Sequence, residues 1–203
     1  RLERPTDYAP LLDAMEAAQH DRRVSPEEAA RNRLILEFMY RAGLRVSEAV
    51  GLKVRDVDVR DGVIRLYDAK GGDGTAYFDA ERLQPLVARW MVVRDSWLFR
   101  TDEVELDDYP FFVKPSKDPV AVRYVQRLVK RLKEQLGIQG VLTPHVLRHT
   151  FATELIGEGF TLPEVSTALR HANLATTAVY LHVRDESLRR KVSRRGHRDD
   201  ERR

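Results

Sequence analysis

The sequence has no cysteine among its 203 residues, which excludes disulfide bonds, thiol nucleophiles and thiolate metal sites. It also has no apolar run near the roughly 18 residues that span a bilayer and no charged-then-apolar signal segment at its start. Its 42% hydrophobic and 33% charged residues are typical of a globular domain with a substantial core. We therefore expect a soluble cytoplasmic protein with one domain and at most a tail.

Charge is distributed unevenly along the chain, although the whole carries only +3. Residues 1–113 contain 17 Lys and Arg against 22 Asp and Glu, whereas residues 114–203 contain 18 against 10. A basic half indicates a polyanionic partner, with nucleic acid as the first candidate and an anionic membrane as the second. Charge alone is equally consistent with a solvated basic surface.

Hydrophobic periodicity predicts a mainly α protein with one small antiparallel β-sheet (α+β). Residues 54–78 are rich in β-branched residues and are broken by turn residues at Asp61-Gly62 and at 71–74, as in hairpins. Ser25 and Thr161 each stand three residues before a glutamate, which marks the start of a helix. The acidic segment 100–110 is expected to be an exposed loop. Helices are expected from residue 6 to about 15, from 26 to a stop at Gly43, and at 80–97, 118–137, 144–157, 162–170 and 174–181.

Two segments place arginines among apolar residues. Arg45 follows a predicted helix end, where its guanidinium can enter a cleft, although an ion pair with Glu48 or a capping role is the commoner outcome. His145 and Arg148 lie three residues apart, on one face of a helix. Arginine suits bidentate contact with phosphate oxygens, and histidine can donate a hydrogen bond to the same group or move a proton.

Two further segments carry a candidate nucleophile and a candidate acid. Tyr180 follows His171 by nine residues. A tyrosine is most often a core or rim aromatic, but its phenol is a competent nucleophile where a charged pocket stabilises the phenolate. Lys70 lies at the predicted hairpin turn, where a lysine is usually only solvated but can also reach a site as a general acid.

In type, order and spacing these residues resemble the catalytic domain of the tyrosine recombinase (phage integrase, Xer-like) family. Residues 142–153 (LTPHVLRHTFAT) are similar to the family's most characteristic segment, residues 43–48 (GLRVSE) to its first arginine motif, and the interval 171–180 to its third motif. The resemblance extends from about residue 6 to 185. Two positions depart from it: Arg170 replaces a usual glycine, and Gly74-Thr75 stand where another basic residue is common.

The resemblance implies a DNA breaking-and-joining enzyme that performs site-specific recombination without a metal, cofactor or ATP. The implied roles are nucleophilic attack by Tyr180, binding of the non-bridging phosphate oxygens by Arg45 and Arg148, hydrogen bonds to the scissile phosphate from His145 and His171, protonation of the leaving 5′ oxygen by Lys70, and support of the first arginine by Glu48.

The resemblance also implies a division of the chain and a set of partners. Residues 1–183 would form the catalytic domain and residues 184–203 a basic tail, a short helix followed by a disordered end. The family's N-terminal core-binding domain would precede this region and is absent from the chain. The expected partner is double-stranded DNA, with a synaptic tetramer in the full-length protein, a monomer for this chain alone, and no membrane.

Two other functions are also consistent with these residues. A type IB topoisomerase resembles these enzymes in its catalytic pocket and would relax supercoiled DNA without a preferred site. A DNA-binding protein that keeps the fold but has lost catalysis would use the basic half for phosphate contacts and salt-dependent affinity.

Overall fold

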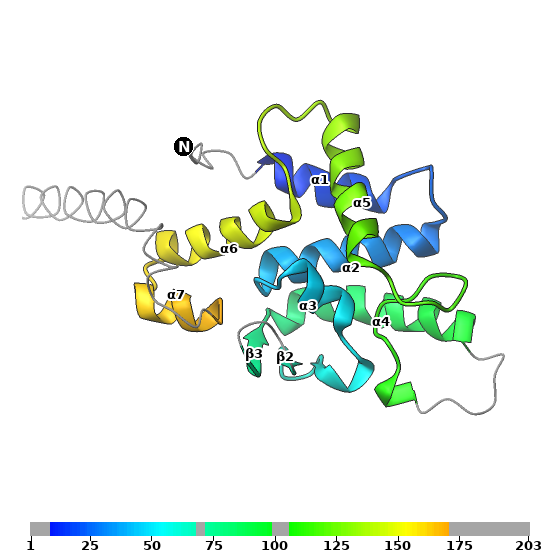
Figure 1. Cartoon of the computed structure of the whole chain (residues 1–203), viewed down its shortest axis with the longest axis horizontal. Coiled ribbons are helices and arrows are strands. Elements are labelled where there is room, and N and C mark those ends of the chain that lie inside the picture. The colour runs from blue at the N-terminus through cyan, green and yellow to red at the C-terminus, as the bar shows by residue number, and fades with distance from the viewer. Residues whose placement is uncertain (1–8, 68–71, 99–105, 171–203) are drawn as a thin grey trace, which may run out of the picture.

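The computed structural model describes residues 9–67, 72–98 and 106–170, and within them most of the chain is helical, with one small sheet at the lower edge of the molecule in Figure 1. This confirms the predicted fold class. The α-helices are α1 (Ala9–Gln19), α2 (Pro26–Arg41), α3 (Val46–Gly51), α4 (Ala80–Leu98), α5 (Val122–Gln135), α6 (Pro144–Glu158) and α7 (Leu162–Ala168). The strands are β1 (Val57–Asp58), β2 (Val63–Leu66) and β3 (Gly74–Tyr77). The short 3₁₀ helices are η1 (Val54–Asp56) and η2 (Leu106–Asp108).

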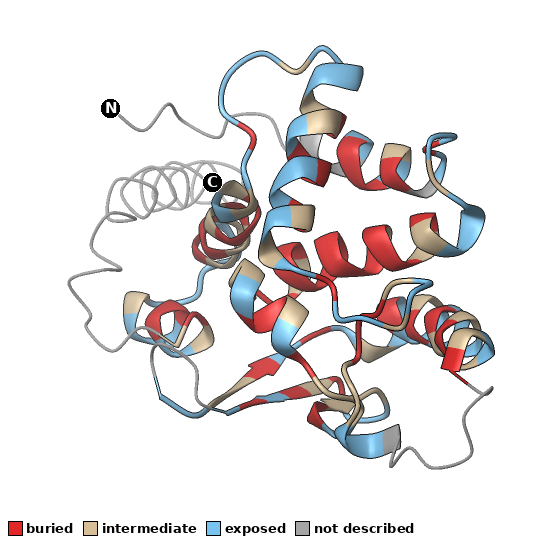
Figure 2. Cartoon of the chain, turned by 45° about the vertical axis from the view of Figure 1, so that its right-hand side comes forward, coloured by how far each residue is buried: buried red, intermediate tan, exposed pale blue. Residues whose placement is uncertain are grey.

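Helix α2 is the centre of the core and packs against α1, α4 and α6. Its buried residues appear as a continuous red band in Figure 2. The ring of Phe38 lies 5.6–5.9 Å from the rings of Phe78, Phe111 and Phe112. Ser25 caps the helix as predicted, because its hydroxyl accepts the N–H of Glu28 at 3.2 Å. The helix is thus fixed both at its start and along its length.

The chain turns sharply between α2 and α3 at Gly43, which has a φ of 60°. A Cβ atom at this position would lie 2.5 Å from the Cδ1 atom of Phe151 in α6. Only glycine combines this left-handed backbone with so close a contact. The predicted stop at Gly43 is therefore confirmed, and it places the start of α3 against α6.

The sheet has the order β1-β2-β3 and is antiparallel throughout. Val57 pairs with Ile64 across the first pair of strands, and Leu66 pairs with Gly74 across the second. Ile64, Leu66 and Ala76 are buried on the face that meets the core. The connection between β2 and β3 contains residues 68–71, so Lys70 lies outside the described residues.

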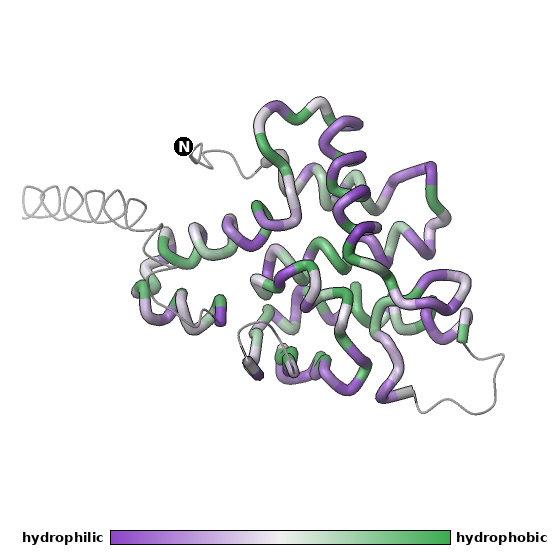
Figure 3. Tube along the Cα trace, in the orientation of Figure 1, coloured by the Kyte–Doolittle hydropathy of each residue, from purple (hydrophilic) through white to green (hydrophobic). Residues whose placement is uncertain are grey.

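Helix α5 begins at Val122, four residues after the predicted start at 118. Pro119 instead forms an isolated antiparallel bridge with Val113, and the N–H of Val120 donates to the carbonyl of Phe112 at 3.0 Å. The strand-like pairing extends the chain until Ala121, the N-cap. Beyond it, α5 is mostly hydrophilic (Figure 3), with its buried residues on one side.

The C-terminal part of the described chain is the pair α6 and α7, which projects to one side in Figure 1. Thr161 and Glu164 form the predicted capping box at the start of α7. This helix ends at Ala168, two residues before the predicted end. The expected helix at 174–181 and the expected tail at 184–203 lie outside the described residues. None of the helices in the described ranges has the length and apolar content needed to cross a membrane.

Candidate active site

Glu48 is the centre of a cluster of charged side chains at the start of α3. Its carboxylate accepts the backbone N–H of Arg45 at 2.7 Å through Oε2, and Nη1 of Arg45 donates to Oε1. The Glu48 side chain is 4% exposed, whereas that of Arg45 is 28% exposed. Because the carboxylate holds both the backbone and the side chain of Arg45, it directs this guanidinium towards the partly open side of the cluster.

Arg148 reaches the same carboxylate from α6. Its Nη1 atom donates to the carbonyl of Gly43 at 2.6 Å and lies 3.5 Å from Oε2 of Glu48. Its Nη2 atom donates to the carbonyl of Leu169, at the end of α7. With a side chain that is only 4% exposed, Arg148 connects the turn after α2, the helix α3 and the end of α7.

Arg170 is the third guanidinium in this cluster. Its Nη2 atom donates to Oε2 of Glu48 at 2.9 Å and to the carbonyl of Gly43 at 3.2 Å, and Nη1 donates to the carbonyl of Ala168 at 3.0 Å. From the sequence this position was only a departure from the family pattern. The signal that pointed to it was a charged residue in place of a glycine, directly before His171. We call Arg45, Glu48, Arg148 and Arg170 the arginine–glutamate cluster.

Three guanidiniums around one carboxylate leave the cluster with an excess of positive charge. Burial opposes ionisation of Glu48, but the neighbouring Arg170, followed by the hydrogen bonds of Arg45 and the charge of Arg148, holds its pKa below the ordinary value. The carboxylate therefore stays negative at neutral pH. Such a cluster can bind a phosphate group, since arginine donors in a site of low water content interact strongly with anions.

The structure brings only part of the predicted site together within the described residues. Arg45, Glu48 and Arg148 meet directly. His145 lies on the first turn of α6, one turn before Arg148, and is exposed. The predicted residues Lys70, His171 and Tyr180 lie outside the described residues. His171, the first residue of the motif at 171–180, nevertheless follows Arg170 directly in the chain.

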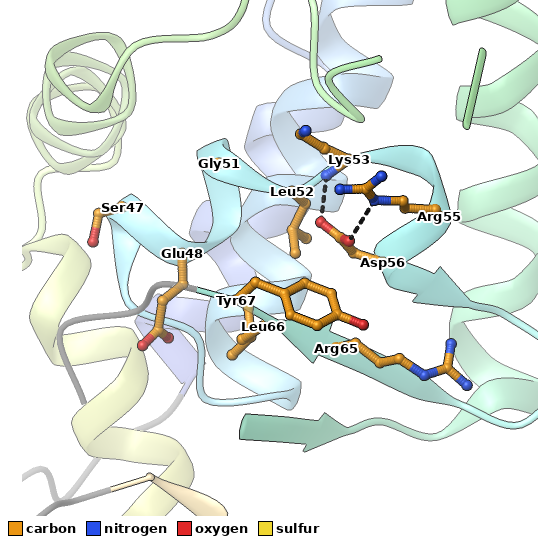
Figure 4. A pocket seen from close by; sticks show the side chains of 10 residues that line it. All are labelled: Ser47, Glu48, Gly51, Leu52, Lys53, Arg55, Asp56, Arg65, Leu66 and Tyr67. Atoms are coloured by element: carbon orange, nitrogen blue, oxygen red, sulfur yellow. Dashed lines mark hydrogen bonds and ion pairs between the residues drawn. The ribbon is translucent and has the colours of Figure 1, made fainter. Parts of the chain in front are cut away.

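A pocket of about 290 Å³ borders the cluster between α3, η1 and β2 (Figure 4). Glu48 belongs to both. Beside it, the exposed ring of Tyr67 extends across the pocket in Figure 4. On the far wall Lys53 and Arg55 form ion pairs with Asp108. The pocket is therefore lined by charged side chains of both signs, and in Figure 4 the carboxylate of Glu48 points away from its far wall.

Comparison with known proteins supports the resemblance. The chain matches the phage integrase family over residues 5–187. It is 37% identical to the tyrosine recombinase XerD of Ralstonia nicotianae over 164 residues, which is 78% of this chain and 50% of that protein. It is also 37% identical to the tyrosine recombinase XerA of Thermococcus kodakarensis over 172 residues, 82% of this chain and 56% of that one. The chain thus spans about half the length of these relatives.

Solved structures agree with the sequence comparison. The crystal structure of XerA recombinase superimposes with a TM-score of 0.76 at 26% identity, covering 96% of this chain and 66% of that one. The XerH site-specific recombinase bound to a palindromic difH substrate gives a TM-score of 0.74 at 26% identity, over 95% and 53% of the two chains. The chain therefore belongs to the phage integrase family, the tyrosine recombinases.

Proposed function

We propose that this chain is the catalytic domain, residues 1–183, of a site-specific DNA recombinase that breaks and rejoins strands through a 3′-phosphotyrosine intermediate. The supporting observation is that Arg45 and Arg148, about a hundred residues apart in sequence, meet on the Glu48 carboxylate. The chain belongs to a family whose relatives are named tyrosine recombinases, and this favours recombination over the topoisomerase and the non-catalytic binder.

In the proposed reaction the phenol oxygen of Tyr180 attacks the scissile phosphorus. A bond forms between that oxygen and phosphorus, and the bond from phosphorus to the 5′ oxygen breaks. The phenol proton passes to a base, for which His145 is the candidate on α6, and Lys70 donates a proton to the departing 5′ oxygen. Attack of a 5′ hydroxyl on the phosphotyrosine reverses the step, so rejoining conserves the bond energy and needs no ATP.

The arginines stabilise the negative charge that gathers on the phosphorus in the transition state. Arg45 and Arg148 would bind the non-bridging oxygens, with His171 donating another hydrogen bond. Each such donor can supply roughly 3–4 kcal/mol when it is fixed before the reaction. Hydrogen bonds from Arg148 to Gly43 and Leu169 and from Arg45 to Glu48 supply that fixation.

Helix α5 supports double-stranded DNA as the partner. Arg123, Arg127 and Lys130 are exposed and lie four and three residues apart, so they form one stripe along the helix. The opposite face, with Val125 and Leu128, is buried. A rigid, exposed row of positive charges is suited to contacts with a phosphate backbone.

This stripe leads to a prediction about salt dependence. In the complete protein, the double variant R123A/R127A should weaken DNA binding similarly for all sequences. It should also reduce the slope of log K against log salt by about 1 for each phosphate that the variant no longer neutralises. The matched control is R82A/R89A, which removes two exposed arginines from α4. Fluorescence anisotropy over a series of salt concentrations measures the slope for the wild type, the variant and the control. Equal slopes for all three proteins would rule out contacts between the stripe and phosphate.

A covalent-adduct assay tests the proposed function. The complete protein is incubated with nicked suicide DNA substrates, and adducts that survive denaturant are digested and sequenced by mass spectrometry. We expect a phosphotyrosine at residue 180 and no adduct with Y180F, which lacks only the attacking oxygen. Site-independent relaxation of supercoiled DNA would favour the topoisomerase, whereas DNA binding without an adduct on any substrate would favour the non-catalytic binder.

The proposed function also places the protein in an assembly. Exchange of strands between two sites requires four cleavages, so we infer a synaptic tetramer on DNA for the complete protein and a monomer for this chain alone. The basic tail at residues 184–203 is our candidate for contact between neighbouring copies. Action on chromosomal or plasmid DNA would place the protein in the cytoplasm, at the nucleoid.

A further inference from the structure

Arg170 has a backbone conformation that is uncommon for a residue with a Cβ atom. Its φ is 54°, in the left-handed region that glycine enters without steric cost. It follows Leu169, the C-cap of α7, and its N–H donates to the carbonyl of Thr167 at 2.9 Å. Helices commonly end in this conformation, but residues other than glycine keep it where the surrounding structure holds them in it, and the side chain of Arg170 makes several such contacts.

The Arg170 side chain shares two of its partners with Arg148, and it also contacts the carbonyl next to one that Arg148 contacts. Both guanidiniums donate to the carbonyl of Gly43 and lie next to Oε2 of Glu48. They also donate to consecutive carbonyls at the end of α7, Arg148 to Leu169 and Arg170 to Ala168. The Arg170 side chain is only 8% exposed, so it serves the interior of the cluster and not a DNA surface.

Arg170 also supports the central carboxylate electrostatically. Burial raises the pKa of Glu48, and the charge of Arg170 opposes it together with the two hydrogen bonds of Arg45 and the charge of Arg148, so that the pKa is lowered. Burial in turn lowers the pKa of Arg170, and the charge of Glu48 opposes that shift. The two groups thus keep each other ionised, and it is the ionised carboxylate that Arg45 and Arg148 contact.

The aliphatic part of Arg170 lies against the first residue of β3. A Cβ atom on Gly74 would be 2.9 Å from Cδ and 3.3 Å from Cγ of Arg170. The two positions at which the sequence departs from the family pattern, Arg170 and Gly74, are therefore in contact. The missing side chain of one makes room for the additional side chain of the other.

From this geometry we infer that Arg170 is a positioning residue for strand cleavage: its guanidinium fixes the Glu48 carboxylate, and through it Arg45 and Arg148, while its stem occupies the space that Gly74 leaves open. The inference rests on the proposed recombinase function. Arg170 need not touch the DNA. It acts on the two arginines that would bind the scissile phosphate, and it joins them to the strand that leads from the Lys70 segment.

The first test compares R170A, R170K and the exposed control R89A in the complete protein. The rate of adduct formation at saturating suicide substrate should fall by about 10- to 100-fold in R170A, because small displacements of positioned groups cost this much, while the DNA dissociation constant stays unchanged. R170K should recover part of the rate, since it keeps the charge but not the planar fork. The acid limb of the pH–rate profile should move to higher pH in R170A but not in R170K.

A second variant tests the contact without removing the arginine. G74A should crowd the aliphatic part of Arg170 and slow cleavage. In the R170A background the same substitution should have no further effect on the rate. The control G157A adds a Cβ atom where the surrounding space is open, so it should leave the cleavage rate unchanged. If R170A folds and cleaves at the wild-type rate, the inference is wrong and the recombinase function is unaffected. If R170A does not fold, a wild-type cleavage rate in G74A has the same meaning. Absence of an adduct with the wild-type protein would instead overturn the proposed function.

Discussion

The R148A variant is expected to form the covalent DNA adduct about 10²- to 10³-fold more slowly than wild type, because it loses a donor that is fixed before the reaction. It should also be less stable. The carbonyl of Leu169 loses its buried donor, at about 1–3 kcal/mol for a group left unsatisfied, whereas the carbonyl of Gly43 loses one donor and keeps that of Arg170. Glu48 loses one of its three neighbouring guanidiniums as well. Single-turnover cleavage and denaturant unfolding measure the two effects on one preparation.

R148K separates these two contributions. A lysine keeps the positive charge beside Glu48 but cannot reach two carbonyls on different segments with one planar group. We therefore expect the lysine variant to recover part of the stability, while its cleavage stays close to that of R148A. R89A provides an exposed control for the removal of an arginine. If R148A cleaved at the wild-type rate, the assignment of Arg148 to the scissile phosphate would be wrong.

Helix positions were predictable where the start signal and the apolar stripe lie in one segment. Helix α2 begins at the Ser25 cap and is followed by Gly43, whose left-handed backbone ends the helix. Helix α7 begins with a complete capping box. Helix α5 shows the limit of this reasoning. Pro119 suits the first turn of a helix, but here it pairs with Val113, a contact that depends on how the preceding segment folds back. Tertiary pairing of that kind has no local signature.

The candidate site was predictable only as far as motifs define it. Arg45, Glu48 and Arg148 were selected by residue type, order and resemblance, and the structure shows them in one cluster. The function of Arg170 was not predictable, because its partners come from the turn after α2, the start of α3 and the end of α7. No spacing rule relates positions 43, 48 and 170. Their contact follows only from the packing of α6 and α7 beside α3.

The second large effect is expected from E48Q, which is nearly isosteric but removes the only negative charge of the arginine–glutamate cluster. Three guanidiniums would then face one another around a neutral amide. Breaking a buried ion pair by neutralising one partner costs about 3–5 kcal/mol, so denaturant unfolding at neutral pH should show a loss of that order. Cleavage should fall by at least about 100-fold as Arg45 loses its fixed position. E16Q, at an exposed position of α1, is the matched control.

The pH dependence of this loss identifies its cause. The pKa of Glu48 is lowered in the folded protein, since Arg170, Arg45 and Arg148 outweigh the effect of burial. A lowered pKa stabilises the fold above the ordinary glutamate value of about 4.3, and this stabilisation is lost as the pH falls through the folded-state value. The stability difference between wild type and E48Q should therefore be largest at neutral pH and shrink in acid. A difference that stays constant with pH would mean that E48Q acts through packing, and that the charge of Glu48 does not hold the three arginines in place.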